Sequence, residues 1–242
     1  MSQKIFYERQ AGLGLIRMDD RKANAIQDEF IGQFQEALDR AEADRVRALV
    51  LTGREGMFSG GLDLKTLPAL PGPDLKATLQ AFSRLMQRVF IFPAPVVCAA
   101  GGHALAAGMI LYLAGDLRFA LQDEHLKFGL NEVAIGIPLP RWIVAQCSHA
   151  VPPRFHTEVL LHAEIMDPAL THRRGITHDL ATSPDALLAL ALDQATRLAR
   201  LDAEAYRITK RRLREPVLQA CGGMEGEDLE EFAAVGPFRS PA

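Results

Sequence analysis

The stretch that decides the fold runs from Val96 to Leu117 and reads VVCAAGGHALAAGMILYLAGDL. Pro93 and Pro95 hold the chain extended in front of it, and the apolar residues 96–100 predict a short buried strand. Two glycines end this strand. Residues 104–113 then combine helix-forming side chains with an absence of charge, which predicts a helix that is buried on nearly all sides.

The glycine turn between this strand and helix has two interpretations. The first N–H groups of a helix have no partner within the helix and lie at the positive end of its macrodipole, which suits a developing negative charge. Small residues at this place would equally allow the helix to pack closely against a sheet. The stretch by itself leaves both interpretations open.

A second paired-glycine turn lies in residues 57–64, which read MFSGGLDL and follow a strand-like segment. Paired glycines most often form nothing more than a tight turn, because glycine accepts positive φ without strain. Two such turns, each placed to expose backbone N–H groups, can also act as a pair of hydrogen-bond donors. The proline-rich loop that follows, residues 68–73, is long enough to lie over a site.

The rest of the pattern places strands mainly in the first half of the chain and helices in the second, without a linker between domains. Asp28 and Asp74 are expected to cap two amphipathic helices. The expected strands span residues 5–7, 13–18, 47–52, 117–121 and 126–128, and the expected helices span residues 28–44, 74–89, 185–201 and 203–214.

Composition excludes several classes of function. The 242 residues are 48% hydrophobic and 24% charged, which suits a soluble globular protein, and the net charge of −3 favours neither nucleic acid nor a membrane surface as a partner. The 3 cysteines and 7 histidines lack metal-ligand spacing, so no metal site is expected. The first residues contain no long apolar segment, so we expect a cytoplasmic protein without a signal peptide or membrane span.

The cysteines and one basic run are expected to have structural roles. Cys98, Cys147 and Cys221 are far apart in the sequence and are expected to be reduced, buried residues. Residues 210–214 read KRRLR within a helix-like segment. This run predicts a solvated helix face, with a contact to a phosphate as the alternative.

Glu132 stands among apolar residues in the segment FGLNEVAIGI, residues 128–137. It is either the exposed residue of an edge strand or a general base whose pKa is raised by desolvation. Other catalytic motifs are absent: Arg17 replaces the third glycine of a dinucleotide fingerprint, and no phosphate-binding loop or Gly-x-Ser-x-Gly turn occurs. Two turns that donate backbone N–H groups can stabilise an oxyanion formed at a thioester carbonyl, and the single acidic residue can act as the base that moves a proton beside it.

Three ordered motifs resemble the signatures of the crotonase, or enoyl-CoA hydratase/isomerase, superfamily. They are FSGGLDL at 58–64, AAGGHALAAG at 99–108 and FGLNEV at 128–133. The resemblance implies an α/β fold, a crotonase-like spiral of ββα units over residues 1–185, with a helical trimerisation region over residues 186–242. It also implies a homotrimer or hexamer that acts on an acyl-CoA thioester in fatty acid metabolism such as β-oxidation, with coenzyme A as part of the substrate and no separate cofactor.

The resemblance also assigns roles to individual residues. By position, Gly60 and Ala107 would donate the oxyanion N–H groups, although glycine is usual where Ala107 stands. The family's motifs place the adenine and pantetheine of coenzyme A near the residues that match Arg21, Lys22, Ala23, Asp63 and Leu64.

Two departures from the family pattern concern the reaction and the end of the chain. Hydratases of the family carry two glutamates; the first falls on Ile110 here and the second on Glu132. The segment GIPLPRW, residues 136–142, is similar to that of Δ3,Δ2-enoyl-CoA isomerases, with Leu139 and Trp142 as candidate walls of the acyl pocket. The chain ends at Ala242, where the family usually has one more helix.

The sequence therefore predicts an enoyl-CoA isomerase with Glu132 as its single acid/base. Two alternatives remain open. A hydratase or another lyase of the family would need a second acid, such as Asp63 or Glu124, to reach the site. The protein could also be a homologue that binds acyl-CoA without catalysis.

Overall fold

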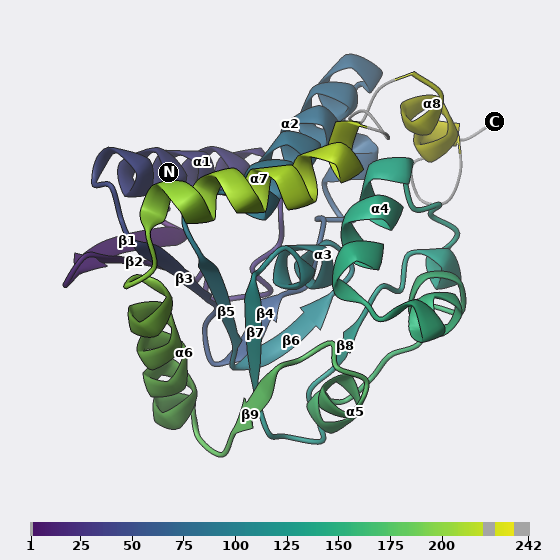
Figure 1. Cartoon of the computed structure of the whole chain (residues 1–242). Coiled ribbons are helices and arrows are strands. Elements are labelled where there is room, and N and C mark those ends of the chain that lie inside the picture. Colours follow the sequence, from purple (N-terminus) through teal and green to yellow (C-terminus); the bar gives the residue numbers. More distant parts are fainter. Residues whose placement is uncertain (1, 220–225, 235–242) are drawn as a thin grey trace.

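The computed structural model describes residues 2–219 and 226–234 (Figure 1). Its strands are β1 Ile5–Gln10, β2 Leu13–Met18, β3 Ala48–Thr52, β4 Gly56–Ser59, β5 Val96–Ala100, β6 Gly102–Leu105, β7 Leu117–Leu121, β8 Phe128–Gly129 and β9 Asp179–Ala181. Its α-helices are α1 Asp28–Ala43, α2 Gly72–Phe90, α3 Ala107–Leu113, α4 Arg141–Ala150, α5 Pro168–Arg173, α6 Pro184–Leu198, α7 Ala203–Gln219 and α8 Gly226–Ala234.

The strands form two sheets that the chain visits in alternation. One sheet has six strands in the order β1-β2-β3-β5-β7-β9, and the other has three in the order β4-β6-β8. Only the β1–β2 hairpin is antiparallel among these pairs. Each of the pairs β3–β4, β5–β6 and β7–β8 sends its first strand to the larger sheet and its second to the smaller one. This alternation is the expected spiral of ββα units.

Helices cover both faces of the larger sheet (Figure 1). Alternate residues of its strands pack with α6 on one face, and the others join the main core with α1, α2 and α3. Strands covered on both faces are apolar throughout, which explains runs such as VVCAA in β5. The same continuous runs allowed these strands to be predicted from the sequence.

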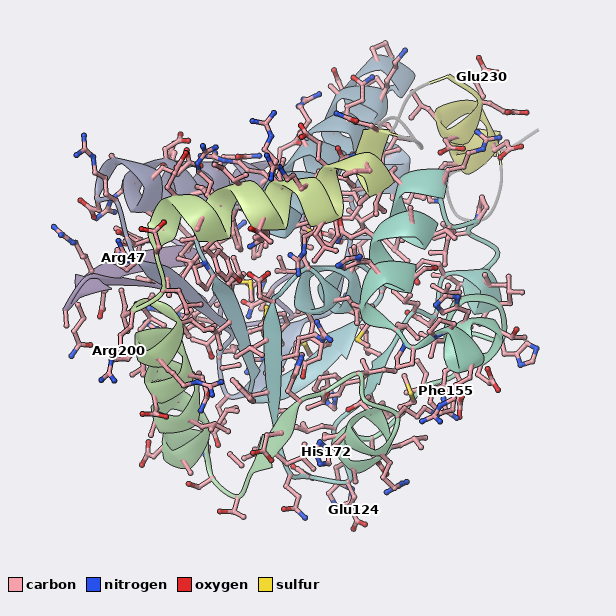
Figure 2. The ribbon with its side chains drawn as sticks, in the orientation of Figure 1. Arg47, Glu124, Phe155, His172, Arg200 and Glu230 are labelled. Carbon is pink, nitrogen blue, oxygen red and sulfur yellow. The ribbon has the colours of Figure 1, made fainter. Side chains whose placement is uncertain are left out.

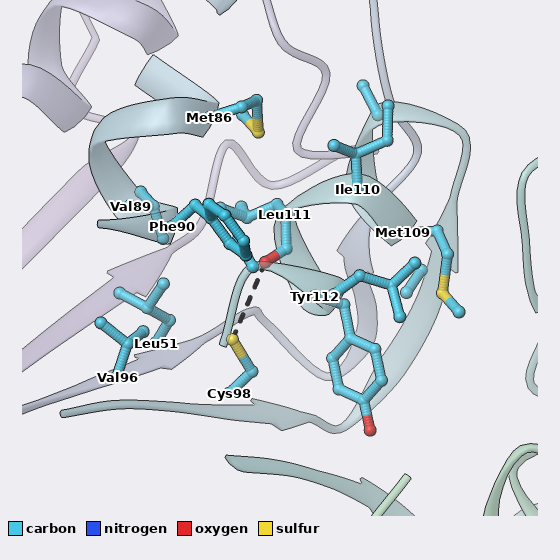
Figure 3. Close-up of a cluster of buried hydrophobic side chains, with 14 of the residues drawn as sticks. Leu51, Met86, Val89, Phe90, Val96, Cys98, Met109, Ile110, Leu111 and Tyr112 are labelled. Carbon is cyan, nitrogen blue, oxygen red and sulfur yellow. Dashed lines mark hydrogen bonds between the residues drawn. The ribbon is translucent and has the colours of Figure 1, made fainter. Parts of the chain in front are cut away.

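Helix α3 lies at the centre of the main core. All of its residues are buried, as predicted, and the Cys98 thiol donates to the Leu111 carbonyl at 3.9 Å (Figure 3). The predicted start of this helix at residue 104 is wrong. Residues 102–105 instead form β6, which pairs with both β4 and β8, and the helix begins at Ala107.

Both predicted helix caps are also wrong. Gln27 and Pro71 occupy the N-cap positions of α1 and α2, and neither makes a side-chain capping bond. Asp28 instead accepts a hydrogen bond from the Thr78 hydroxyl at 2.6 Å, so it joins α1 to α2. Pro73 lies in the first turn of α2, where a missing N–H costs no intrahelical bond.

The basic run in α7 is not a uniformly solvated face, which corrects the sequence prediction. Lys210 and Arg214 are buried and bind Asp116 at 2.6 and 3.0 Å, whereas the exposed Arg211 pairs with Glu215 on the same helix. Residues four apart lie on one side of a helix, so Lys210 and Arg214 face the core together while Arg211 faces the solvent. The buried pair fastens α7 to the connection between α3 and β7.

Three further observations complete the comparison with the sequence. Cys98 and Cys147 are free and buried, while Cys221 lies outside the described residues. Strand β9 was not anticipated, helix α8 lies within the helical region expected over residues 186–242, and α7 extends beyond residue 214 to Gln219. No helix of the described chain is long and apolar enough to cross a lipid bilayer.

Candidate active site

The predicted site residues meet around an apolar cavity of about 110 Å³. Gly60, Leu64, Ala107, Ile110, Glu132 and Leu139 all line it, although they come from three separate segments of the chain. The remaining lining residues are Leu62, Phe82, Leu105, Ala106, Asn131, Ile135, Ile137, Pro138, Pro140, Ile143 and Phe232. The last of these belongs to α8, so the helical region expected over residues 186–242 also helps to form the site, which the sequence did not predict.

Glu132 is buried in this cavity, with 8% of its surface exposed, so the edge-strand alternative is wrong. It follows β8 and directly precedes a short helical turn, Val133–Ile135. Burial raises the pKa of its carboxyl group to about 7, and its Oε2 atom has no hydrogen-bond partner among the described residues. A carboxylate in this state can take up a proton at neutral pH.

The Gly60–Gly61 turn contacts the start of α3 beside this carboxylate, whereas the other paired glycines, Gly101 and Gly102, lie at the start of β6 against the start of β4 and do not line the cavity. Gly61 has φ +93°, and a Cβ added there would lie 2.9 Å from Ala106 Cβ and 3.0 Å from Ala107 N. A Cβ on Gly108 would lie 2.1 Å from the Ser59 carbonyl oxygen. Glycine is therefore required on both sides for the end of β4 to approach the start of α3.

The expectation that Gly60 offers a free N–H group is wrong in this structure, because that group donates to the Ala23 carbonyl at 2.8 Å. The next segment pairs with Ile26, whose N–H donates to Gly61 O at 2.8 Å and whose carbonyl accepts from Asp63 N at 3.1 Å. Successive N–H groups of an extended chain point in opposite directions. The Leu62 N–H consequently points away from Ile26 and has no partner among the described residues.

Ala107 provides the second unpaired N–H group. It is the first residue of α3, so its N–H has no intrahelical partner, and it forms no hydrogen bond with another described residue. Leu62 and Ala107 line the same cavity as Glu132. The cavity thus combines two available backbone donors with one carboxylate.

Asn24 supports the Leu62 turn and was not singled out in the sequence. Its buried side-chain amide donates to the backbone carbonyls of Met18 and Phe58 at 2.9 and 3.1 Å. Its backbone carbonyl accepts a hydrogen bond from the Ser59 hydroxyl at 2.8 Å. Ser59 Oγ in turn accepts from Gly61 N at 3.2 Å. The signal in the sequence is an asparagine within a polar loop. In the structure this residue has φ +47°, a conformation that asparagine adopts more readily than most residues.

The residues expected to hold coenzyme A lie mostly in an outer groove next to the cavity. Lys22, Ala23, Asp63 and Leu64 line this groove, which shares Gly60, Leu62 and Leu64 with the cavity. Lys4, Lys65 and Asp20 line it as well, and Lys4 is ion-paired with Glu29. Arg21 is exposed with φ +60° and is not among the residues that line the groove.

Trp142 does not line the cavity, which corrects its predicted place as a wall. It is fully buried behind Phe82, with the two ring centroids 5.6 Å apart, and Phe82 forms the wall instead. The two acids considered as partners of Glu132 are also absent from the lining. Asp63 lies in the outer groove, and Glu124 lies in a separate hollow with Asp167, at the lower edge of the molecule in Figure 2.

The geometry agrees with the comparison to known proteins. A family model described as enoyl-CoA hydratase/isomerase matches residues 8–225. The chain belongs to the enoyl-CoA hydratase/isomerase family. As a member of this family it is an acyl-CoA enzyme, and the expected crotonase-like fold is confirmed.

The relatives in the enoyl-CoA hydratase/isomerase family include proteins named as hydratases and proteins named as isomerases. The chain is 30% identical over 241 residues to cyclohexa-1,5-dienecarbonyl-CoA hydratase of Thauera aromatica, covering 96% of this chain and 88% of the relative. It is 25% identical over 241 residues to human mitochondrial enoyl-CoA delta isomerase 1, covering 96% and 78%. A solved apo structure of a Mycobacterium tuberculosis enoyl-CoA isomerase has a TM-score of 0.85 and 31% identity, covering 91% and 95%. The choice between the two reactions therefore rests on the site itself.

Proposed function

We propose that this family member is an enoyl-CoA isomerase, which moves the double bond of a 3-enoyl-CoA to position 2. The observation that carries the proposal is that Glu132 is the single acidic residue among the described residues that line the cavity. Ile110, which cannot transfer a proton, lines the same cavity at the position of the other hydratase glutamate. A double-bond shift needs one base, whereas water addition needs groups to activate the water and to deliver a proton.

The reaction follows from these groups. The thioester oxygen accepts hydrogen bonds from the N–H groups of Leu62 and Ala107, while the coenzyme A portion lies along the outer groove of Lys22, Ala23 and Asp63. Glu132 removes a proton from C2, and the electron pair of that bond delocalises over the dienolate and its oxyanion. The same carboxyl group returns the proton to C4, which leaves the double bond between C2 and C3.

The two donors and the raised pKa have separate roles. Stabilisation of the oxyanion makes the weakly acidic C2 proton removable, and one such donor typically contributes about 10²–10³ in rate. The pKa of about 7 at Glu132 lets one carboxyl group act first as a base and then as an acid near neutral pH.

The test is to follow conversion of 3-hexenoyl-CoA to the 2-enoyl isomer with the wild-type protein and with Glu132→Gln. We expect the variant to lose about 10²–10⁴ in kcat, and the wild-type kcat/KM to rise with pH through about 7. Glu124→Gln, which changes the carboxylate in the separate hollow, is the matched control and should keep full activity. Equal rates for Glu132→Gln and the wild type would exclude Glu132 as the base.

Two other outcomes identify the alternatives. The hydratase names among the relatives favour water addition as the second candidate, and hydration of crotonyl-CoA faster than isomerisation of 3-hexenoyl-CoA would establish it. Tight binding of acyl-CoA without turnover of any enoyl-CoA would identify a binding protein. A place in fatty acid β-oxidation and a cytoplasmic location stay predictions.

A further inference from the structure

We propose that the acyl subsite admits a short apolar acyl group of about four to six carbon atoms, and that Phe82, Ile110 and Ile143 set this limit. The inference rests on the proposed acyl-CoA chemistry of the cavity and names the substrate class. Three observations support it: the size of the cavity, the packing behind two of its lining residues, and the partition between the cavity and a neighbouring hollow.

The cavity has room for few carbon atoms. An apolar protein cavity of about 150 Å³ holds benzene, which has six carbons, so the roughly 110 Å³ available here correspond to about four. The cavity meets the outer groove at Gly60, Leu62 and Leu64, so the one or two carbons nearest the thioester lie at this junction and the whole acyl group has about four to six carbons. Apart from Asn131 and Glu132, the side chains that line the cavity are apolar, which excludes a charged acyl terminus.

Two of the lining residues, Phe82 and Ile110, are held from behind by buried residues of α4. The Phe82 ring meets the Trp142 ring edge-on, with the centroids 5.6 Å apart and the planes at 64°. The backbone carbonyl of Ile110 accepts from Gln146 Nε2 at 3.3 Å. Trp142 and Gln146 are both fully buried, so Phe82 or Ile110 cannot move back without displacing packed side chains.

A partition separates the cavity from a wider apolar hollow. Ile137, Pro138 and Leu139 line both spaces, and the hollow beyond them, with a volume of about 680 Å³, includes Val144 and Leu161. Pro138 and Pro140 fix φ in this segment, which stiffens it. A long acyl chain would have to cross the partition to reach the hollow, so short chains should bind better.

The experiment measures binding of saturated butyryl-, hexanoyl-, decanoyl- and lauroyl-CoA by calorimetry, which does not depend on turnover. We expect hexanoyl-CoA to bind the wild type at least about tenfold more tightly than lauroyl-CoA. Ile143→Ala should enlarge the cavity and reduce this preference by about fivefold or more. The matched control is Ile31→Ala in α1, since Ile31 and Ile143 are each 4% exposed and Ile31 does not line the cavity.

Phe82→Leu provides a second variant of the wall if Ile143→Ala does not fold. Equal affinity of the wild type for hexanoyl- and lauroyl-CoA, or no affinity for any of the four, would overturn the inference. An unchanged preference in the folded wall variants would overturn the assignment of these residues. Short-chain binding without isomerisation of any 3-enoyl-CoA would support the chain-length limit while it contradicts the proposed reaction.

Discussion

At the scale of single residues, burial of Glu132 links catalysis to stability. The folded protein holds this carboxyl group in an apolar cavity, where the charged form lacks the water that would stabilise it. The raised pKa means that the folded state binds this proton more tightly than the unfolded chain does. The stabilising contribution is complete below the ordinary pKa of 4.5 and is lost as the pH rises through about 7.

Glu132→Gln should therefore stabilise the protein at alkaline pH. The difference between 4.5 and about 7 corresponds to at most about 3 kcal/mol at pH 8, at about 1.4 kcal/mol per pH unit. The amide carries no charge, so this penalty disappears, and the gain should shrink toward zero near pH 5. Urea unfolding of both proteins at pH 5 and pH 8 measures the effect, and an equal difference at the two pH values would contradict it.

At the scale of elements, the contact between the Leu62 turn and the start of α3 places the two donors in one cavity. Close approach is possible because Gly61 and Gly108 have no side chains to separate the segments. The network of Asn24 and Ser59 holds the first turn from its other side. Both donors therefore depend on packing between segments about forty-five residues apart in the chain.

Gly61→Ala should lower kcat/KM by about 10² or more, because the added methyl group displaces the donor turn from Ala107 and the backbone has φ +93°. Steady-state kinetics with 3-hexenoyl-CoA measures this loss. Gly32→Ala in α1 is the control: it points into open space and should leave activity unchanged while adding about 0.5–1 kcal/mol of stability. Wild-type activity in Gly61→Ala would show that this contact does not position the donors.

Asp116→Asn should destabilise the protein by about 3–5 kcal/mol, because it removes the only carboxylate that pairs with the buried Lys210 and Arg214 among the described residues. Burial already lowers the pKa of Lys210 to about 8, against the opposing effect of Asp116. Denaturant unfolding at pH 7 measures the change. Glu215→Gln, which removes the half-buried partner of the exposed Arg211 on the same helix, should have little effect, and similar losses in both variants would contradict the role of burial.

At the scale of the whole molecule, an apolar surface lies next to the active site. Val133, Val144 and Leu161 are 43%, 39% and 64% exposed and line the hollow beyond the partition. Apolar surface concentrated in one place favours association between subunits. This surface supports the prediction of a homotrimer or hexamer, and the contribution of residues 186–242 to trimerisation stays a prediction.

Light scattering coupled to size exclusion should give a mass three or six times the 26.5 kDa of one chain. Val144→Glu should shift the protein toward the monomer, because a charge would be buried at the interface. Lys76→Glu, an exposed change on α2 outside residues 186–242 and away from the hollow, is the control and should leave the mass unchanged. A monomeric wild type at micromolar concentration would contradict the predicted assembly.

The sequence by itself determined the features that local patterns record. Continuous apolar runs placed β3 and β5, an uncharged segment placed the buried helix α3, and three motifs with Glu132 and Ile110 indicated the family and a site with one acid. These features depend on backbone preference, on burial and on residue identity. Each of them can be judged within about ten neighbouring residues.

Only the tertiary structure decided which atoms face the cavity. The pairing of residue 62 with Ile26 leaves the Leu62 N–H, rather than that of Gly60, as the available donor, and packing against Phe82 removes Trp142 from the wall. The same holds for Lys210 and Arg214, whose burial depends on Asp116 almost a hundred residues earlier, and for Phe232 of α8. A side chain's periodicity shows that it is buried or exposed, but its partner is fixed by the way distant segments pack.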